Sequence, residues 1–255
     1  MKRSAFLLLP ALIAALVFLL LRGDDDTPPR GPAVPFASVI IDPGHGGACP
    51  GALHGALCED EVNYDIALRL YNMLKKGNKS AFITVRDHGF PHPADALSCD
   101  RGEVLGNGRE VTLRGRIALI RALDPGEKAL LISIHINSLP AVMRGFSLYY
   151  PRDGERRMKE SRDIAGRLSR SLVAGKVLPL SMDSGIFTWS FDPVRPRIYR
   201  WNFVPAIFSA TGSRAVVLCE LGNIRNAEDR EMLSSPRYRE LLARRLYHAL
   251  MPVVR

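Results

Sequence analysis

The segment SVIIDPGHGG, residues Ser38–Gly47, contains a short β-branched run that stops at Pro43 and Gly44. A run of this kind, bounded by turn residues, predicts a buried strand that ends in a tight turn. Apolar residues then recur four apart within the segment Val62–Lys76, and Gly77 closes it, as in an amphipathic helix. The fold therefore opens with a strand, a loop and a helix.

Strand and helix patterns continue to alternate along the rest of the chain. Further strands are predicted at residues 81–85, 129–135, 145–150 and 215–220. Further helices are predicted at residues 112–122, 158–173 and 236–250, and a long loop at 90–108. Ser235 is the expected N-cap of the last helix, with Pro236 at its first position. This alternation predicts an α/β fold with a twisted, mostly parallel or mixed sheet flanked by helices on both faces.

The size and composition of the chain fit one globular domain. It has 255 residues, of which 47% are hydrophobic, so it can bury one sizeable core. A formal net charge of +9 favours an anionic partner. The basic residues are scattered along the predicted helices without interleaved aromatics, which argues against nucleic acid as that partner.

The N-terminus predicts export. Lys2 and Arg3 precede an uncharged apolar run, Ala5–Leu21, which as a helix would span about 25 Å. The two basic residues favour a cytoplasmic N-terminus and place the rest of the chain outside. Residues 1–22 are either a membrane anchor or a cleaved signal peptide, and the lack of a small-x-small cleavage site favours the anchor. We expect residues 23–35 to be a disordered tether and 36–255 to be the catalytic domain.

The four cysteines fit an oxidising compartment better than a structural zinc site. Cys49, Cys58, Cys99 and Cys219 lack the paired short spacing of zinc ligands. Cys49 and Cys58 are close enough in sequence to close a small disulfide loop. Cys219 lies within an apolar run, so we expect a buried core residue.

Three polar residues follow predicted strands. His45 comes just after the first strand, His135 ends the strand at 129–135, and Glu220 ends the strand at 215–220. Ligands collect at the carboxyl ends of strands in open α/β sheets, so parallel strands would bring these side chains together. A single histidine at a strand end is ordinarily structural, but two with a carboxylate favour a site. Glu59 or His54 would approach the same crevice from its rim.

Two imidazoles and a carboxylate suit a catalytic zinc ion. Three protein ligands leave a position for water, which zinc activates at neutral pH. A second carboxylate could then move protons, and Glu220 is placed for this general acid/base role. The glycines around His45 lack the Lys-Ser/Thr of a phosphate-binding loop. No serine or cysteine lies in a nucleophile-elbow pattern, which disfavours covalent acyl transfer.

Four segments resemble motifs of the type 3 family of zinc-dependent N-acetylmuramoyl-L-alanine amidases. They occur in the family's order, over about residues 38–250, and jointly they are highly specific. The segments are IDPGHGG at 41–47, EDEVN at 59–63, SIHINS at 133–138 and ELGNIRN at 220–226. Residues 180–212 match the family's pattern poorly.

This resemblance implies a function and a set of site residues. His45, Glu59 and His135 would bind one zinc ion, so Glu59 is favoured over His54. Glu220 would be the catalytic glutamate, and Asn137 would contact substrate. The implied reaction is hydrolysis of the amide between N-acetylmuramic acid and L-alanine in peptidoglycan, on a six-stranded sheet flanked by helices.

The N-terminal segment predicts where the protein acts. We expect it in the periplasm or on the outer face of the cytoplasmic membrane, anchored by residues 5–21. The sequence identifies no activator protein. Two alternatives are a zinc hydrolase of another envelope amide or peptide bond, and a catalytically silent cell-wall-binding protein.

Overall fold

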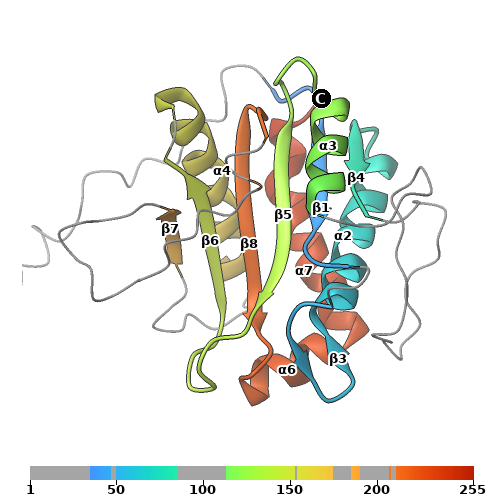
Figure 1. Ribbon diagram of the computed structural model, residues 1–255, viewed down its shortest axis with the longest axis vertical. Helices are drawn as coiled ribbons and strands as arrows, with labels where there is room; N and C mark the ends of the chain where they lie inside the picture. The colour runs from blue at the N-terminus through green and yellow to red at the C-terminus, as the bar shows by residue number, and fades with distance from the viewer. Residues whose placement is uncertain are drawn as a thin grey trace, which may run out of the picture. The chain divides into compact units, whose positions relative to one another are not determined.

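The computed structural model describes residues 35–46, 50–85, 113–152, 154–174, 185–189, 207 and 211–255, which form one α/β unit (Figure 1). The strands are β1 (Val39–Pro43), β2 (Leu53–His54), β3 (Leu57–Cys58), β4 (Ala81–Ile83), β5 (Leu130–Asn137), β6 (Phe146–Pro151), β7 (Gly185–Trp189) and β8 (Ala215–Asn223). The helices are α2 (Glu59–Lys76), α3 (Leu113–Leu123), α4 (Glu155–Ala174), α6 (Ala227–Ser234), α7 (Pro236–Leu250) and the 3₁₀ turn η1 (Met251–Val253).

Six strands form one mixed sheet in the order β4-β1-β5-β8-β6-β7. The strands β4, β1, β5 and β8 are parallel to one another, and β6 is antiparallel to β8. Consequently the carboxyl ends of β1, β5 and β8 lie at the same edge of the sheet. The mixed sheet predicted from the sequence is confirmed, and its six strands are the number that the resemblance implied. The edge strand β7 was not among the strands predicted from the residue pattern.

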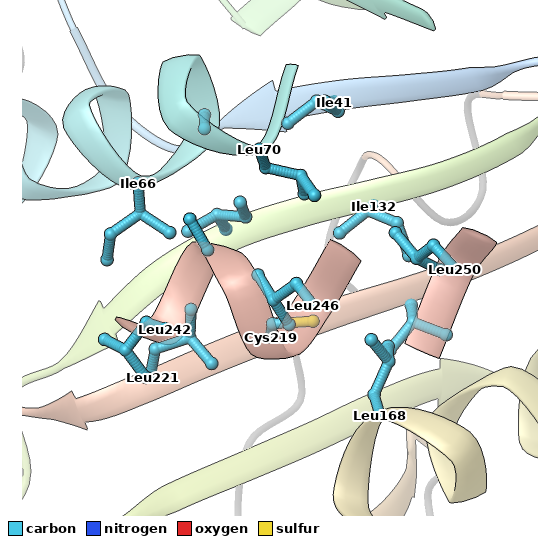
Figure 2. Packing of buried hydrophobic residues seen from close by; sticks show 14 of the residues in the cluster. Ile41, Ile66, Leu70, Ile132, Leu168, Cys219, Leu221, Leu242, Leu246 and Leu250 are labelled. Atoms are coloured by element: carbon cyan, nitrogen blue, oxygen red, sulfur yellow. The ribbon is translucent and has the colours of Figure 1, made fainter. Parts of the chain in front are cut away.

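Helices cover both faces of the sheet, as predicted. Figure 1 shows α2, α7 and α4 on one face and α3 on the other. On the first face, α7 packs against both α2 and α4. Figure 2 shows Leu242 and Leu246 of α7 among Ile132 of β5 and Cys219 of β8. A smaller cluster, including Ile40 and Ile120, joins the other face to α3.

The alternating burial along the strands explains the two clusters. Ile41 of β1 faces the α2 and α7 side, while its neighbour Ile40 faces the α3 side. Successive side chains of a strand point to opposite faces, so a strand covered on both faces is apolar at most positions. The mainly apolar runs noted in the sequence therefore mark the central strands.

Several boundaries differ from those predicted. The helix expected at 62–76 begins one turn earlier, at Glu59, because three acidic residues fill its first turn and favour the positive end of the helix dipole. Ser235 occupies the N-cap position of α7, but its side chain makes no capping hydrogen bond. The hairpin of β2 and β3 and the short helix α6 were not anticipated.

Some predictions fall on parts of the chain that the structure does not describe. The loop at 90–108, the N-terminal segment 1–22, all but the last residue of 23–35, and most of 180–212 lie outside the described residues. Within the described part of the chain, no helix combines the length and apolar composition needed to cross a membrane. The anchor at residues 5–21 therefore stays a prediction.

Candidate metal centre

The side chains of His45, Glu59 and His135 come together at the carboxyl edge of the sheet. His45 lies just beyond β1, His135 lies near the end of β5, and Glu59 is the first residue of α2. One possible ligand atom from each residue lies within 4.8 Å of those of the other two. The parallel pairing of β1 with β5 brings the two histidines to the same edge.

The carboxylate of Glu59 lies between the two imidazoles. Its Oε1 is 3.3 Å from Nε2 of His45 and 3.2 Å from Nδ1 of His135. The two rings meet edge to face, with centroids 5.1 Å apart. The three donor atoms thus converge from the turn after β1, from β5 and from α2.

Backbone amides orient the Glu59 side chain. The amide N–H of Ala52 donates to Oε2 at 2.9 Å, and that of Ile136 donates to Oε1 at 3.2 Å. Burial would raise the pKa of Glu59, but hydrogen bonds and charge from His135 and His45 outweigh it and hold that pKa well below its usual range. Glu59 is therefore an anion that can serve as a ligand.

Glu220 lies beside the three convergent residues. It pairs with His135 across the β5–β8 ladder, so both side chains emerge at the same level of the sheet. Burial, reinforced by the negative charge of Glu59 and opposed by His45, raises the pKa of Glu220 to about 8. Its Oε2 is buried and makes no hydrogen bond with the described residues. A carboxyl group with this pKa can exchange a proton near neutral pH.

The turn after β1 has room only for a glycine at position 44. A Cβ atom on Gly44 would lie 2.1 Å from Cε1 of His135, so the backbone passes directly over that ring. The next residue, His45, has φ of 65°, in the left-handed region that non-glycine residues seldom adopt. This tight turn is what aims the imidazole of His45 back toward Glu59.

The donor set fits a catalytic zinc ion. Two imidazole nitrogens and one carboxylate oxygen are ligand types that zinc prefers, and three protein ligands leave a coordination position for water. The His45 side chain is 30% exposed, so the cluster is open to solvent on one side. The orphaned Oε2 of Glu220 fits a proton acceptor for a water molecule at that position.

The other residues singled out in the sequence have different outcomes. His54 is exposed on the β2–β3 hairpin and is not part of the convergent group. Asn137 is half-buried at the end of β5, and its role in substrate binding stays a prediction. Cys58 is disulfide-bonded, but Cys49 lies outside the described residues, so their pairing also stays a prediction. Cys219 is a free, fully buried core residue, as expected.

Two buried residues that contact the His45 turn were not singled out from the sequence. Asn63 lies one turn of α2 beyond Glu59, and Arg116 comes from α3. The spacing of Asn63 from Glu59 places both on one face of a helix, which is a usable signal. Arg116 has no such signal, because Arg114 and Arg121 occupy the same helix.

Comparisons with known proteins place the chain in a family. Residues 39–251 match a family model described as N-acetylmuramoyl-L-alanine amidase. The chain is 24% identical over 215 residues to the germination-specific N-acetylmuramoyl-L-alanine amidase of Bacillus subtilis (strain 168). That similarity covers 84% of this chain and 78% of the relative.

Solved structures share the fold. The amidase Ami1 from Mycobacterium smegmatis has a TM-score of 0.62 and 19% identity, covering 85% of this chain and 96% of that chain. The amidase AmiC2 of Nostoc punctiforme has a TM-score of 0.60 and 20% identity, with the same coverage. At these identities, the likeness establishes the fold alone.

Proposed function

This chain belongs to the N-acetylmuramoyl-L-alanine amidase family, and we propose that it cuts the amide between N-acetylmuramic acid and L-alanine using one zinc ion. His45, Glu59 and His135 would hold the ion, and Glu220 would be the general acid/base. The observation that carries this proposal is the convergence of those three side chains within 4.8 Å. Glu220 adjoins them through its pairing with His135.

The zinc ion would activate the reactants, and the protein would hold its ligands in place. When bound, a zinc ion lowers the pKa of a coordinated water to about 7 and polarises the carbonyl that is attacked. The amide N–H groups of Ala52 and Ile136 keep the Glu59 carboxylate aimed at the site. Orienting contacts of this kind tune metal ligands in other enzymes.

Glu220 would handle the protons of the hydrolysis. Once the carboxyl group has released its own proton, its Oε2 would accept a proton from the attacking water as the new carbon–oxygen bond forms. The same proton then passes to the amide nitrogen as the carbon–nitrogen bond breaks. The products are the lactyl carboxylate of the glycan and the free amino group of the stem peptide, so water is the only other reactant.

The proposal is tested on purified sacculi with mass spectrometry of the products. We expect the wild-type protein to bind one zinc ion and to release intact stem peptides from the glycan. His45→Ala should lose both properties. Glu220→Gln should keep the zinc and lose activity by about 10²- to 10⁴-fold, the usual contribution of general acid/base catalysis.

A control variant and three contrary results make this test decisive. His54→Ala, on the exposed hairpin, should keep zinc and activity. An active metal-free protein would contradict the zinc mechanism. Cleavage of a different amide or peptide bond would support another envelope hydrolase, and sacculus binding without any cleavage would support a silent binding protein.

The proposed substrate also bears on location. Peptidoglycan lies outside the cytoplasmic membrane, so a cell-wall amidase acts there. We propose that residues 5–21 anchor the protein to that membrane, with a cytoplasmic N-terminus. N-terminal sequencing of membrane-fraction protein should find the chain uncleaved; a mature protein that starts beyond residue 22 in the soluble fraction would exclude the anchor.

A further inference from the structure

The turn that carries His45 has its backbone carbonyls held by side chains. Nη1 of Arg116 donates to the carbonyl oxygen of Pro43 at 2.6 Å and to that of His45 at 3.1 Å. Between them, Nδ2 of Asn63 donates to the carbonyl oxygen of Gly44 at 3.1 Å. Three consecutive carbonyls are thus fixed by two residues from two different helices.

These hydrogen bonds hold a backbone conformation that is unfavourable for a non-glycine residue. A left-handed φ at a non-glycine residue such as His45 persists only where its surroundings impose it. One guanidinium nitrogen bridges the carbonyls on either side of Gly44, so it fixes the direction of the chain on both sides of the turn. The backbone is thereby fixed in the position from which Nε2 of His45 lies 3.3 Å from Oε1 of Glu59.

Arg116 is itself fixed by a buried network. Its Nε lies 3.7 Å from Oδ1 of Asp42, a fully buried carboxylate in β1. The hydroxyl of Thr84 donates to Oδ1 of Asp42 at 2.5 Å, and that of Ser133 donates to Oδ2 at 3.1 Å. This network joins β1, β5 and the segment after β4. It therefore fixes the position of Arg116 without any metal ion.

We propose that Arg116 is a positioning residue that, together with Asn63, holds His45 in its metal-binding conformation before the ion arrives. This inference rests on the proposed zinc function. Arg116 acts through the backbone of the turn: its hydrogen bonds go to main-chain carbonyls and its charge faces Asp42. Preorganised ligands bind more tightly because the ordering cost is met during folding.

The test compares two buried arginines with matched contacts. Arg239 also faces an aspartate, Asp65, and its Nη1 also donates to two carbonyls, those of Leu233 and Ser234. It joins α7 to α2 through Asp65, and the two carbonyls to which it donates belong to the end of α6 and not to the His45 turn. Lysine at either position keeps the charge but cannot present the planar fork of donors.

We expect Arg116→Lys to weaken zinc affinity by about 10- to 100-fold, the usual effect of losing a contact that orients a ligand. Arg239→Lys should lower the melting temperature and leave zinc affinity within about twofold of wild type. Affinity is measured by competition with a chromogenic zinc chelator, well below the melting temperature of each variant. Saturating zinc should restore the kcat of Arg116→Lys, whereas Glu220→Gln should not respond.

Two results would overturn the inference: wild-type zinc affinity in Arg116→Lys, or an equal loss of affinity in both arginine variants. If Arg116→Lys does not fold, Asn63→Leu removes the donor to Gly44 from the other helix and carries the same expectation. A wild-type protein that binds no zinc would instead refute the proposed function, so the two failures are distinguishable.

Discussion

At the scale of the residue, the site depends on a carboxyl group whose pKa lies above its ordinary value. Burial, with the charge of Glu59, raises the pKa of Glu220 to about 8, against about 4.3 in an unfolded chain. The metal-free folded protein therefore holds this proton across a pH range in which the unfolded chain has released it. That difference links the stability of the metal-free protein to pH.

The sign of this linkage gives a testable prediction. The contribution of Glu220 to the free energy of unfolding is complete below about pH 4. It is lost as pH rises through about 8, because the pKa in the folded protein is higher than in the unfolded chain. Glu220→Gln removes this loss, so its stability relative to wild type should grow between about pH 5 and 8, by at most about 1.4 kcal/mol per pH unit. Urea unfolding of both metal-free proteins measures it, and parallel pH curves would contradict it.

A second residue-scale prediction concerns Gly44. Alanine there would place its Cβ 2.1 Å from the ring of His135, so ring or backbone must move. We expect Gly44→Ala to lower stability by about 1–3 kcal/mol, as overpacking does, and to impair zinc binding. Gly126→Ala is the control, because the nearest atom to its Cβ would be 3.7 Å away. Thermal unfolding and zinc competition are the measurements; equal effects at both glycines would refute the steric argument.

At the scale of the element, Asn223 joins the end of β8 to the loop between β5 and β6. Its Oδ1 accepts the amide N–H groups of Leu139 and Arg225. Its Nδ2 donates to the carbonyls of Leu139, Pro140 and Met143. This loop directly follows the strand that carries His135, so Asn223 braces the rim of the site.

Removing the Asn223 side chain should destabilise the folded protein. Asn223→Ala leaves several backbone groups without partners, and we expect a loss of about 1–3 kcal/mol in the free energy of unfolding. Hydrogen exchange should accelerate at the amides of Leu139 and Met143. Ser138→Ala, an exposed change in the same loop, should alter neither quantity. Unchanged exchange in Asn223→Ala would show that the loop is held by other contacts.

At the scale of the whole molecule, the hydrophobic core is separate from the metal centre. Leu242, Leu246 and Leu250 of α7 pack on the sheet with α2 and α4 (Figure 2), and none is a metal-centre residue. We therefore expect the protein to stay folded without zinc, unlike small domains that depend on a metal to fold.

Zinc should nevertheless raise the melting temperature by mass action. An ion that binds only the folded state stabilises it by about 2.7 kcal/mol at 100 times its dissociation constant. Calorimetry with and without a chelator measures the shift, and His135→Ala should show none. A wild-type protein that unfolds completely on zinc removal would contradict the separation of core and site.

The sequence predicted most of the fold because its signals are local. Apolar runs such as Leu130–Ile134 and the helical spacing within Val62–Lys76 reflect burial that each element imposes on its own residues. The order of strands and helices then limits the topologies available. The start of α2 was missed by one turn, because its acidic first residues carry no apolar periodicity.

What the sequence by itself determined was the central strands and the positions at their ends, which place His45, His135 and Glu220 at one edge. The motif resemblance already favoured Glu59 over His54, and the tertiary structure brings Glu59 beside the two histidines. Only the tertiary structure decided that Arg116 and Asn63 hold the turn that carries His45. The contact from Arg116 to Pro43 spans 73 residues. Such a contact depends on how helices pack on the sheet, and no local pattern records which buried arginine will meet which carbonyl.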